Sequence, residues 1–165
     1  MYRVRHDVRL VLASASPRRQ QMLADLGLSF SLAPSDVDES LLPAETAPQA
    51  AQRLARLKAQ AALAQWPDRA VLAADTLVAL PDGRILGKPR DHDQARGMLK
   101  MLSGREHLVV SGYCLFWRGH EHCGAVESRV RFRALMEAEI EAYLASGEPM
   151  DKAGAYAVQG LATAF

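Results

Sequence analysis

The sequence has little cysteine, few aromatic residues, no long apolar run and almost no net charge. Two cysteines in 165 residues exclude a disulfide-dense class. The 20 Lys and Arg residues nearly balance the 19 Asp and Glu residues, whereas a general nucleic-acid binder or a polybasic membrane anchor would need a basic excess. No stretch approaches the ~20 apolar residues of a membrane span, and the run Leu10 to Ala13 is too short for a signal peptide. We therefore expect a soluble cytoplasmic protein with neither a nucleic-acid nor a membrane partner.

The composition is otherwise that of a globular domain. Hydrophobic residues make up 49% and charged residues 24%, and the length suits one domain with its own core. Cys114 and Cys123 flank a predicted hairpin tip from Arg118 to His122, so they could face each other across paired strands. Because no secretory signal is present, we expect buried, reduced thiols.

Helix and strand signals alternate in the first half of the chain, and a hairpin follows. Ser16 and Pro17 are typical of a helix start directly after a strand, and Met22, Leu23 and Leu26 predict an apolar face for that helix. This order predicts an α/β fold with a mixed sheet. The predicted strands are 8–13, 70–74, 107–117, 123–133 and 154–158, and the predicted helices are 17–26, 49–65, 92–102 and 137–146.

Ligands of α/β sheets bind at the carboxyl ends of strands, so polar residues at those ends carry most weight. The turn from Ser14 to Arg19 combines a hydroxyl, helix N-terminal amides and two guanidiniums that could bind one anion. An ordinary capped helix with solvated arginines is the alternative. Asp75 ends an apolar strand, where a carboxylate needs a metal, a water to activate, or backbone amides to cap. The sequence alone leaves these roles of Asp75 open.

Two lysines and an acidic loop extend this set. Lys88 lies between Gly87 and Pro89, and Lys58 borders the apolar stripe of a helix, so either ammonium could reach a phosphate or simply be solvated. The acidic loop of Asp36, Asp38 and Glu39 offers hard oxygen ligands for Mg²⁺ or Mn²⁺, although such loops are usually solvated.

The segment 120–123, with two histidines, a glutamate and a cysteine, lacks a second ligand cluster and is interpreted as surface. No nucleophile of an acyl-transfer site is visible in the chain. The combination of cations with metal-binding carboxylates therefore favours hydrolysis of a phosphoric anhydride.

Five motifs in order along the chain resemble the Maf family of nucleoside triphosphate pyrophosphatases. The resemblance spans nearly the whole sequence. The motifs are Leu12-Ala-Ser-Ala-Ser-Pro-Arg-Arg19, Ala74-Asp-Thr76, Gly83-Arg-Ile-Leu-Gly-Lys-Pro89, Met98-Leu-Lys-Met-Leu-Ser-Gly104 and Gly147-Glu-Pro-Met-Asp-Lys-Ala-Gly-Ala-Tyr-Ala-Val-Gln-Gly160.

This resemblance implies cleavage of a nucleoside triphosphate to the monophosphate and pyrophosphate with a divalent cation, Mg²⁺ or Mn²⁺. It implies an elongated, two-lobed α/β fold similar to inosine triphosphatases, with a central cleft. Asp75 matches the family's proton acceptor, and the phosphate-binding positions match Ser14, Arg18, Lys58 and Lys88. The resemblance implies Asp38 and Asp75 as metal ligands, although Asp38 stands where many members have Glu.

The family's substrate subgroups differ at three positions. This chain has Arg18, Thr76 and Gln159, as do the members that act on dTTP and UTP. The resemblance therefore implies dTTP, UTP and modified pyrimidine nucleotides as substrates. The alternatives are the 7-methyl-GTP subgroup and a division-regulating nucleotide-binding module without useful turnover, which the retained Asp75 disfavours.

The resemblance also bears on chain organisation. It implies a single Maf-like domain over 1–165 and a homodimer. Family members continue beyond the Gln-Gly motif, so we expect that the usual C-terminal segment is lacking after Phe165.

Overall fold

The computed structural model describes residues 8–165, which form two compact units. Unit 1 comprises the described residues up to Asp75 together with 111–126, and unit 2 comprises 76–110 together with 127–165. The strands lie in the sheet in the order β2 (Phe30–Leu32), β1 (Leu10–Leu12), β3 (Ala70–Ala79), β5 (Glu106–Trp117) and β6 (His120–Arg131), with β4 (Ile85–Leu86) paired to β3. Strand β1 is parallel to β2 and β3, whereas β4 is antiparallel to β3, which confirms the predicted α/β class with a mixed sheet.

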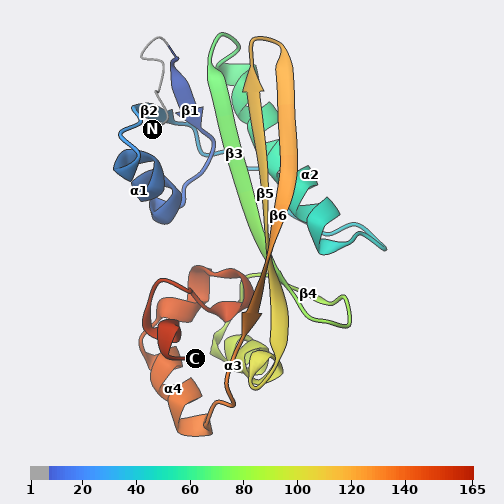
Figure 1. Cartoon of the computed structure of the whole chain (residues 1–165), viewed down its shortest axis with the longest axis vertical. Coiled ribbons are helices and arrows are strands. Elements are labelled where there is room, and N and C mark those ends of the chain that lie inside the picture. Colours follow the sequence, from blue (N-terminus) through green and yellow to red (C-terminus); the bar gives the residue numbers. More distant parts are fainter. Residues whose placement is uncertain (1–7) are drawn as a thin grey trace. The chain divides into compact units, whose positions relative to one another are not determined.

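Unit 1 is built around strands β1 (Leu10–Leu12), β2 (Phe30–Leu32) and the first part of β3 (Ala70–Ala79), with helices α1 (Pro17–Asp25) and α2 (Ala47–Gln65) (Figure 1). Small buried residues let α2 lie close to strand β5 (Glu106–Trp117). A Cβ built on Gly112 of β5 would lie 2.0 Å from the carbonyl oxygen of Ala51, so only glycine permits this approach.

Helix α1 begins as predicted but does not bury the predicted apolar face. Ser16 occupies the N-cap position and Pro17 the first turn, although the Ser16 hydroxyl makes no capping hydrogen bond. No residue of α1 is buried, and Met22 and Leu26 are 60% and 69% exposed. The expectation of an apolar inner face is wrong because the inward direction is taken by Arg19, whose guanidinium donates to a carbonyl of β3.

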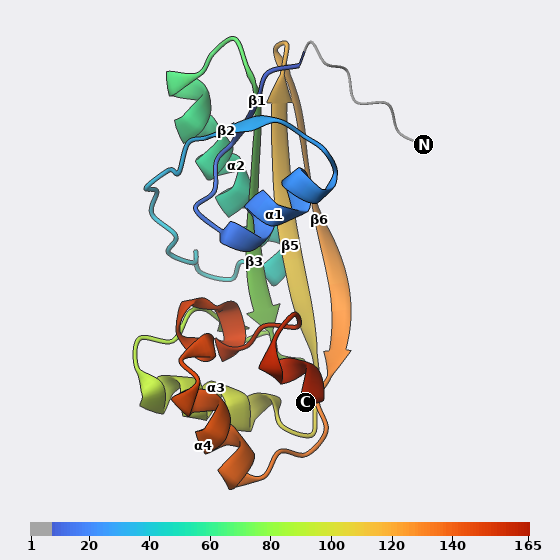
Figure 2. The same ribbon diagram turned by 90° about the vertical axis from the view of Figure 1, so that its left-hand side faces the viewer.

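Unit 2 contains β4 (Ile85–Leu86), α3 (His92–Leu102) and α4 (Glu137–Ala145), and the two helices lie side by side (Figure 2). The Asp91 side chain caps α3 by accepting from the backbone N–H of Gln94 at 2.7 Å. The Gln94 side chain accepts from the backbone N–H of Arg90 in return. The core of unit 2 combines aliphatic residues such as Leu99 and Ile140 with the aromatic Phe132, Tyr143 and Tyr156.

The last predicted strand, 154–158, is wrong. That region forms short 3₁₀ turns instead: η1 (Glu148–Asp151), η2 (Ala153–Ala155) and η3 (Leu161–Ala164). Gly154 has a φ of +69°, and a Cβ there would lie 2.9 Å from a methyl carbon of Val78. The chain therefore turns tightly against β3, where a continuous strand would clash, and the Gly154 N–H donates to the Gly87 carbonyl.

The predicted hairpin is confirmed as β5 and β6 (His120–Arg131), joined by a two-residue turn. Arg118 and Gly119 both have positive φ, as such tight hairpin turns require. The expectation of reduced thiols is wrong for this structure, since Cys114 and Cys123 form a disulfide. The hairpin register puts them opposite each other, with Cα atoms 4.0 Å apart, which brings their sulfurs within bonding reach. No helix of the described residues is both long and apolar enough to cross a membrane.

Candidate active site

The centre of the candidate site in unit 1 is an ammonium group held between two carboxylates. Lys58 Nζ lies 2.5 Å from Asp75 Oδ1 and 2.7 Å from Glu39 Oε1. The side chains of Lys58 and Asp75 are each 10% exposed, whereas that of Glu39 is 46% exposed. The three groups come from α2, β3 and the loop after β2, so segments distant in the sequence meet at one cation.

The local patterns of α2 and β3 account for this pairing. In β3 every second side chain from Val71 through Ala73 to Asp75 is buried, as expected for one face of a strand. In α2 Lys58 lies one turn after Leu54 on the buried stripe. A buried carboxylate and a buried ammonium are each costly to desolvate alone, so the fold keeps them in contact.

The turn between β1 and α1 lies against the same part of β3. Ser14 Oγ accepts hydrogen bonds from the backbone N–H of Ser16 at 3.2 Å and from the Arg19 guanidinium at 3.3 Å. The same guanidinium nitrogen donates to the carbonyl of Ala74 at 2.7 Å, immediately before Asp75. Burial lowers the pKa of Arg19, and the negative charge of Asp75 opposes that shift. An arginine remains protonated throughout, so it supplies a fixed positive charge beside Asp75.

The two adjacent arginines of the turn differ in environment. Arg18, which the family resemblance assigns to the phosphate site, is exposed, and Arg19 is the one bonded to Ser14 and Ala74. The role of Arg18 stays a prediction. The sequence predicts that both guanidiniums of this turn bind one anion and does not distinguish Arg19 from Arg18. Only the helical phase of α1, set by its N-cap, distinguishes the two side chains.

The acidic loop shows a similar difference between neighbours. Asp38 is exposed, and its carboxylate accepts from the hydroxyl and the N–H of Ser40 at 2.5 and 2.9 Å. These bonds, the hydroxyl first, lower the pKa of Asp38. Glu39 shares Lys58 with Asp75 instead. Two carboxylates around one cation are a donor set that suits Mg²⁺ or Mn²⁺, so Glu39 and Asp75 fit a divalent metal, and the metal role of Asp38 stays a prediction.

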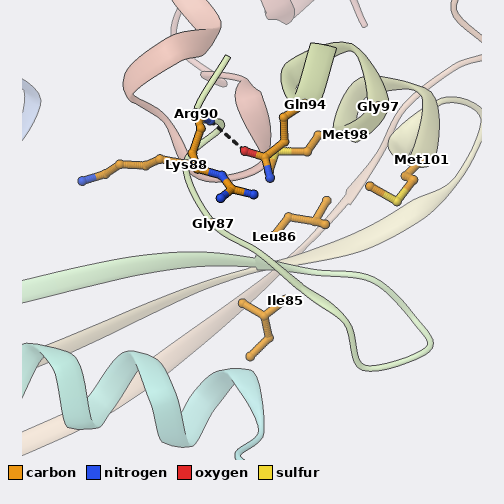
Figure 3. Close-up of a pocket in the computed structure, with 9 residues that line it drawn as sticks. All are labelled: Ile85, Leu86, Gly87, Lys88, Arg90, Gln94, Gly97, Met98 and Met101. Carbon is orange, nitrogen blue, oxygen red and sulfur yellow. Dashed lines mark hydrogen bonds between the residues drawn. The ribbon is translucent and has the colours of Figure 1, made fainter. Parts of the chain in front are cut away.

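The remaining predicted site residues belong to unit 2. Lys88 is exposed just after β4. It lines a pocket of about 480 Å³ together with Arg90 and Met98, and its ammonium extends away from the other lining side chains (Figure 3). Thr76, half-buried, follows Asp75 directly, and Gln159 is exposed. Whether these three residues act with the residues of unit 1 stays a prediction.

The histidines at 120 and 122 lie at the start of β6, directly after the hairpin turn. Their predicted position on the surface is confirmed, since both are exposed.

The fold and this geometry define an α/β protein in which a buried carboxylate and ammonium lie beside an arginine at a strand-to-helix turn. Comparison with known proteins identifies the family to which it belongs. The family model described as Maf-like protein matches residues 9–165, and the chain belongs to this family.

Curated relatives carry the name dTTP/UTP pyrophosphatase. The protein of Syntrophotalea carbinolica is 50% identical over 161 residues, which cover 94% of this chain and 72% of that protein. Those of Thermococcus kodakarensis and Hahella chejuensis are 50% and 51% identical, covering 92% and 95% of this chain and 80% and 79% of theirs. A solved structure of a HAM1 protein from Coxiella burnetii aligns with a TM-score of 0.55 at 17% identity, covering 75% of this chain and 72% of that one. This likeness supports the fold.

Proposed function

We propose that the chain is a nucleoside triphosphate pyrophosphatase that hydrolyses dTTP and UTP to the monophosphate and pyrophosphate. The names of relatives at about half identity over most of the chain support this function. The structural observation that carries it is the buried Asp75, held by Lys58 at 2.5 Å beside the arginine turn. A carboxylate that merely capped a turn would have backbone amides as partners rather than a buried ammonium.

In the proposed mechanism Asp75 orients and deprotonates the attacking water. Lys58 donates to Oδ1 of Asp75, and we assign the other oxygen, Oδ2, to the water. Proton acceptance by a positioned carboxylate contributes about 10²- to 10⁴-fold to the rate of such reactions.

The cations and amides of unit 1 are the proposed phosphate contacts. The N-terminus of α1, Ser14 and Arg19 lie together at the β1–α1 turn, where backbone N–H groups and a guanidinium favour phosphate oxygens. We assign Arg18 and Lys88 to the same triphosphate, as the family resemblance implies. Their role is to neutralise charge that builds up on the leaving pyrophosphate.

A divalent cation would be held by Glu39 and Asp75, whose carboxylates are brought together by Lys58 Nζ within 2.7 Å of each. When bound, the cation supplies charge neutralisation for the phosphate oxygens. A matched pair of neighbours tests this assignment. We expect Glu39→Gln to raise the Mn²⁺ concentration for half-maximal activity at least 10-fold, while Asp38→Asn leaves it within about 2-fold. The reverse order would assign the metal to Asp38.

Base selectivity is proposed to depend on Arg18, Thr76 and Gln159. A side-chain amide or hydroxyl left unpaired by a wrong base penalises that base. The test is kcat/KM for dTTP, UTP, dATP and 7-methyl-GTP with Mg²⁺ and with Mn²⁺. We expect dTTP and UTP to be preferred, and a preference for 7-methyl-GTP would overturn the subgroup assignment. The homodimer stays a prediction, to be measured by light scattering.

A further inference from the structure

A second cluster of possible metal ligands lies in unit 1, on the β5–β6 hairpin. Cys114 of β5 faces Cys123 of β6, and Glu121 lies two residues before Cys123 on the same face of its strand. One ligand atom from each of the three residues lies within 4.8 Å of the other two. Among the described residues this is the only such group of three His, Cys, Asp or Glu side chains.

The surroundings of Glu121 hold its carboxylate in place. Oε1 lies 3.3 Å from the sulfur of Cys123. Arg56 of α2 contacts both carboxylate oxygens, with Nε at 2.8 Å from Oε1 and a terminal nitrogen at 2.9 Å from Oε2. A two-point arginine contact fixes the carboxylate plane and leaves each oxygen a further lone pair. Cys114 is fully buried and Cys123 half-buried, so the sulfurs are shielded from bulk water.

We propose that Cys114, Cys123 and Glu121 form a binding site for one thiophilic divalent cation such as Zn²⁺ when the disulfide is reduced. Two thiolates and a carboxylate carry three negative charges, and Zn²⁺ together with Arg56 carries three positive charges, so the filled site is neutral. Zinc prefers thiolate with nitrogen or carboxylate ligands in tetrahedral geometry, and water would take the fourth position. Mg²⁺ prefers oxygen ligands, so this site differs in chemistry from the proposed active-site cation.

The oxidation state of the cysteines then switches the site. A dithiol reductant delivers two electrons, the sulfur–sulfur bond breaks, each sulfur gains a proton, and the dithiol becomes a cyclic disulfide. Binding of the cation replaces the two thiol protons, which are released to solvent. In the oxidised chain the sulfurs are bonded to each other, so only Glu121 remains as a ligand.

The test is a Co²⁺ titration of the full chain after reduction with a dithiol and removal of the dithiol without oxygen. We expect one Co²⁺ per reduced chain with a near-ultraviolet thiolate-to-metal absorption band, about two protons released per cation, and displacement by Zn²⁺. The oxidised chain should show no band. A reduced chain without the band, or Co²⁺ bound through the exposed histidines of the hairpin and therefore without thiolate absorption, would overturn the proposal.

Variants identify the ligands. Cys123→Ser and Cys123→Ala should each lose the band while circular dichroism shows the fold retained. Glu121→Gln should weaken Co²⁺ binding at least 10-fold, and Glu127→Gln, an exposed acid on the same strand, should leave it unchanged. Equal affinity in Glu121→Gln and Glu127→Gln would overturn the three-residue site.

Discussion

Replacement of Asp75 by Asn is the perturbation that separates a catalytic from a structural role. The change keeps the size of the side chain and removes its charge and its ability to accept a proton. Turnover should fall at least ~10²-fold, equal to about 2.7 kcal/mol of activation free energy. Nucleotide binding should be lost to a smaller degree, because Arg19 and the N-terminus of α1 still contact the phosphates in the proposed site.

The structure also bounds the cost in stability. Breaking a buried ion pair by removing one partner costs roughly 3–5 kcal/mol. Here the asparagine oxygen can still accept from Lys58, and Glu39 remains 2.7 Å from the same ammonium. We therefore expect the free energy of unfolding to fall by about 1–3 kcal/mol, and Tm by roughly 2–4 °C for each kcal/mol. The variant should stay folded at assay temperature.

The assay is kcat for dTTP and Tm on the same preparation, with Asp68→Asn as a matched control. Asp68 is an exposed acid just before β3, so its replacement should leave both quantities near those of the wild type. A double variant that also carries Lys58→Met should recover part of the lost stability, because the buried ammonium is removed, without recovering turnover. Near-normal kcat in Asp75→Asn would refute the catalytic role.

Three further predictions concern the packing that supports the units. Gly112→Ala places a methyl 2.0 Å from the Ala51 carbonyl oxygen, so the free energy of unfolding measured in urea should fall by ~1–3 kcal/mol. An unchanged midpoint would contradict the close approach of α2 to β5. Tyr156→Phe removes the hydroxyl 2.7 Å from His107 Nε2 in the core of unit 2 and should cost about 1–3 kcal/mol by the same assay. Burial lowers the pKa of His107 below its ordinary 6.5, so the unfolded chain binds the proton first and the free energy of unfolding should fall as pH drops below 6.5. His107→Gln should flatten that decline, and an equally steep decline in the variant would assign it to other groups.

Local signals in the sequence were sufficient for most elements of the fold. The Pro17 start of α1 and the β5–β6 hairpin are confirmed, because each depends on interactions between residues close in the chain. The predictions of an apolar inner face for α1 and of a strand at 154–158 are wrong for the same reason, since both features depend on contacts with a segment distant in the chain. The Arg19 guanidinium of α1 donates to a carbonyl of β3, and the chain at Gly154 lies against Val78 of β3.

The candidate site divides in the same way. The sequence indicates Asp75 because it ends a strand, and Lys58 because it borders the apolar stripe of a helix. The structure brings these two residues into contact. The sequence does not distinguish Glu39 from Asp38 as the acid of this loop that contacts Lys58, because tertiary contacts determine the directions in which adjacent loop residues point. The disulfide of the hairpin was also missed, since the spacing allowed facing cysteines and the expected compartment favoured thiols.

The products formed from dTTP test the central claim most directly. Wild-type protein is incubated with dTTP and Mg²⁺ or Mn²⁺, and nucleotides, pyrophosphate and phosphate are separated and quantified, with Asp75→Asn in parallel. A pyrophosphatase whose water is activated by Asp75 yields dTMP and pyrophosphate in equal amounts, with turnover at least ~10²-fold slower in the variant. Formation of dTDP and phosphate, or no turnover of dTTP and UTP by the wild-type protein, would contradict the account.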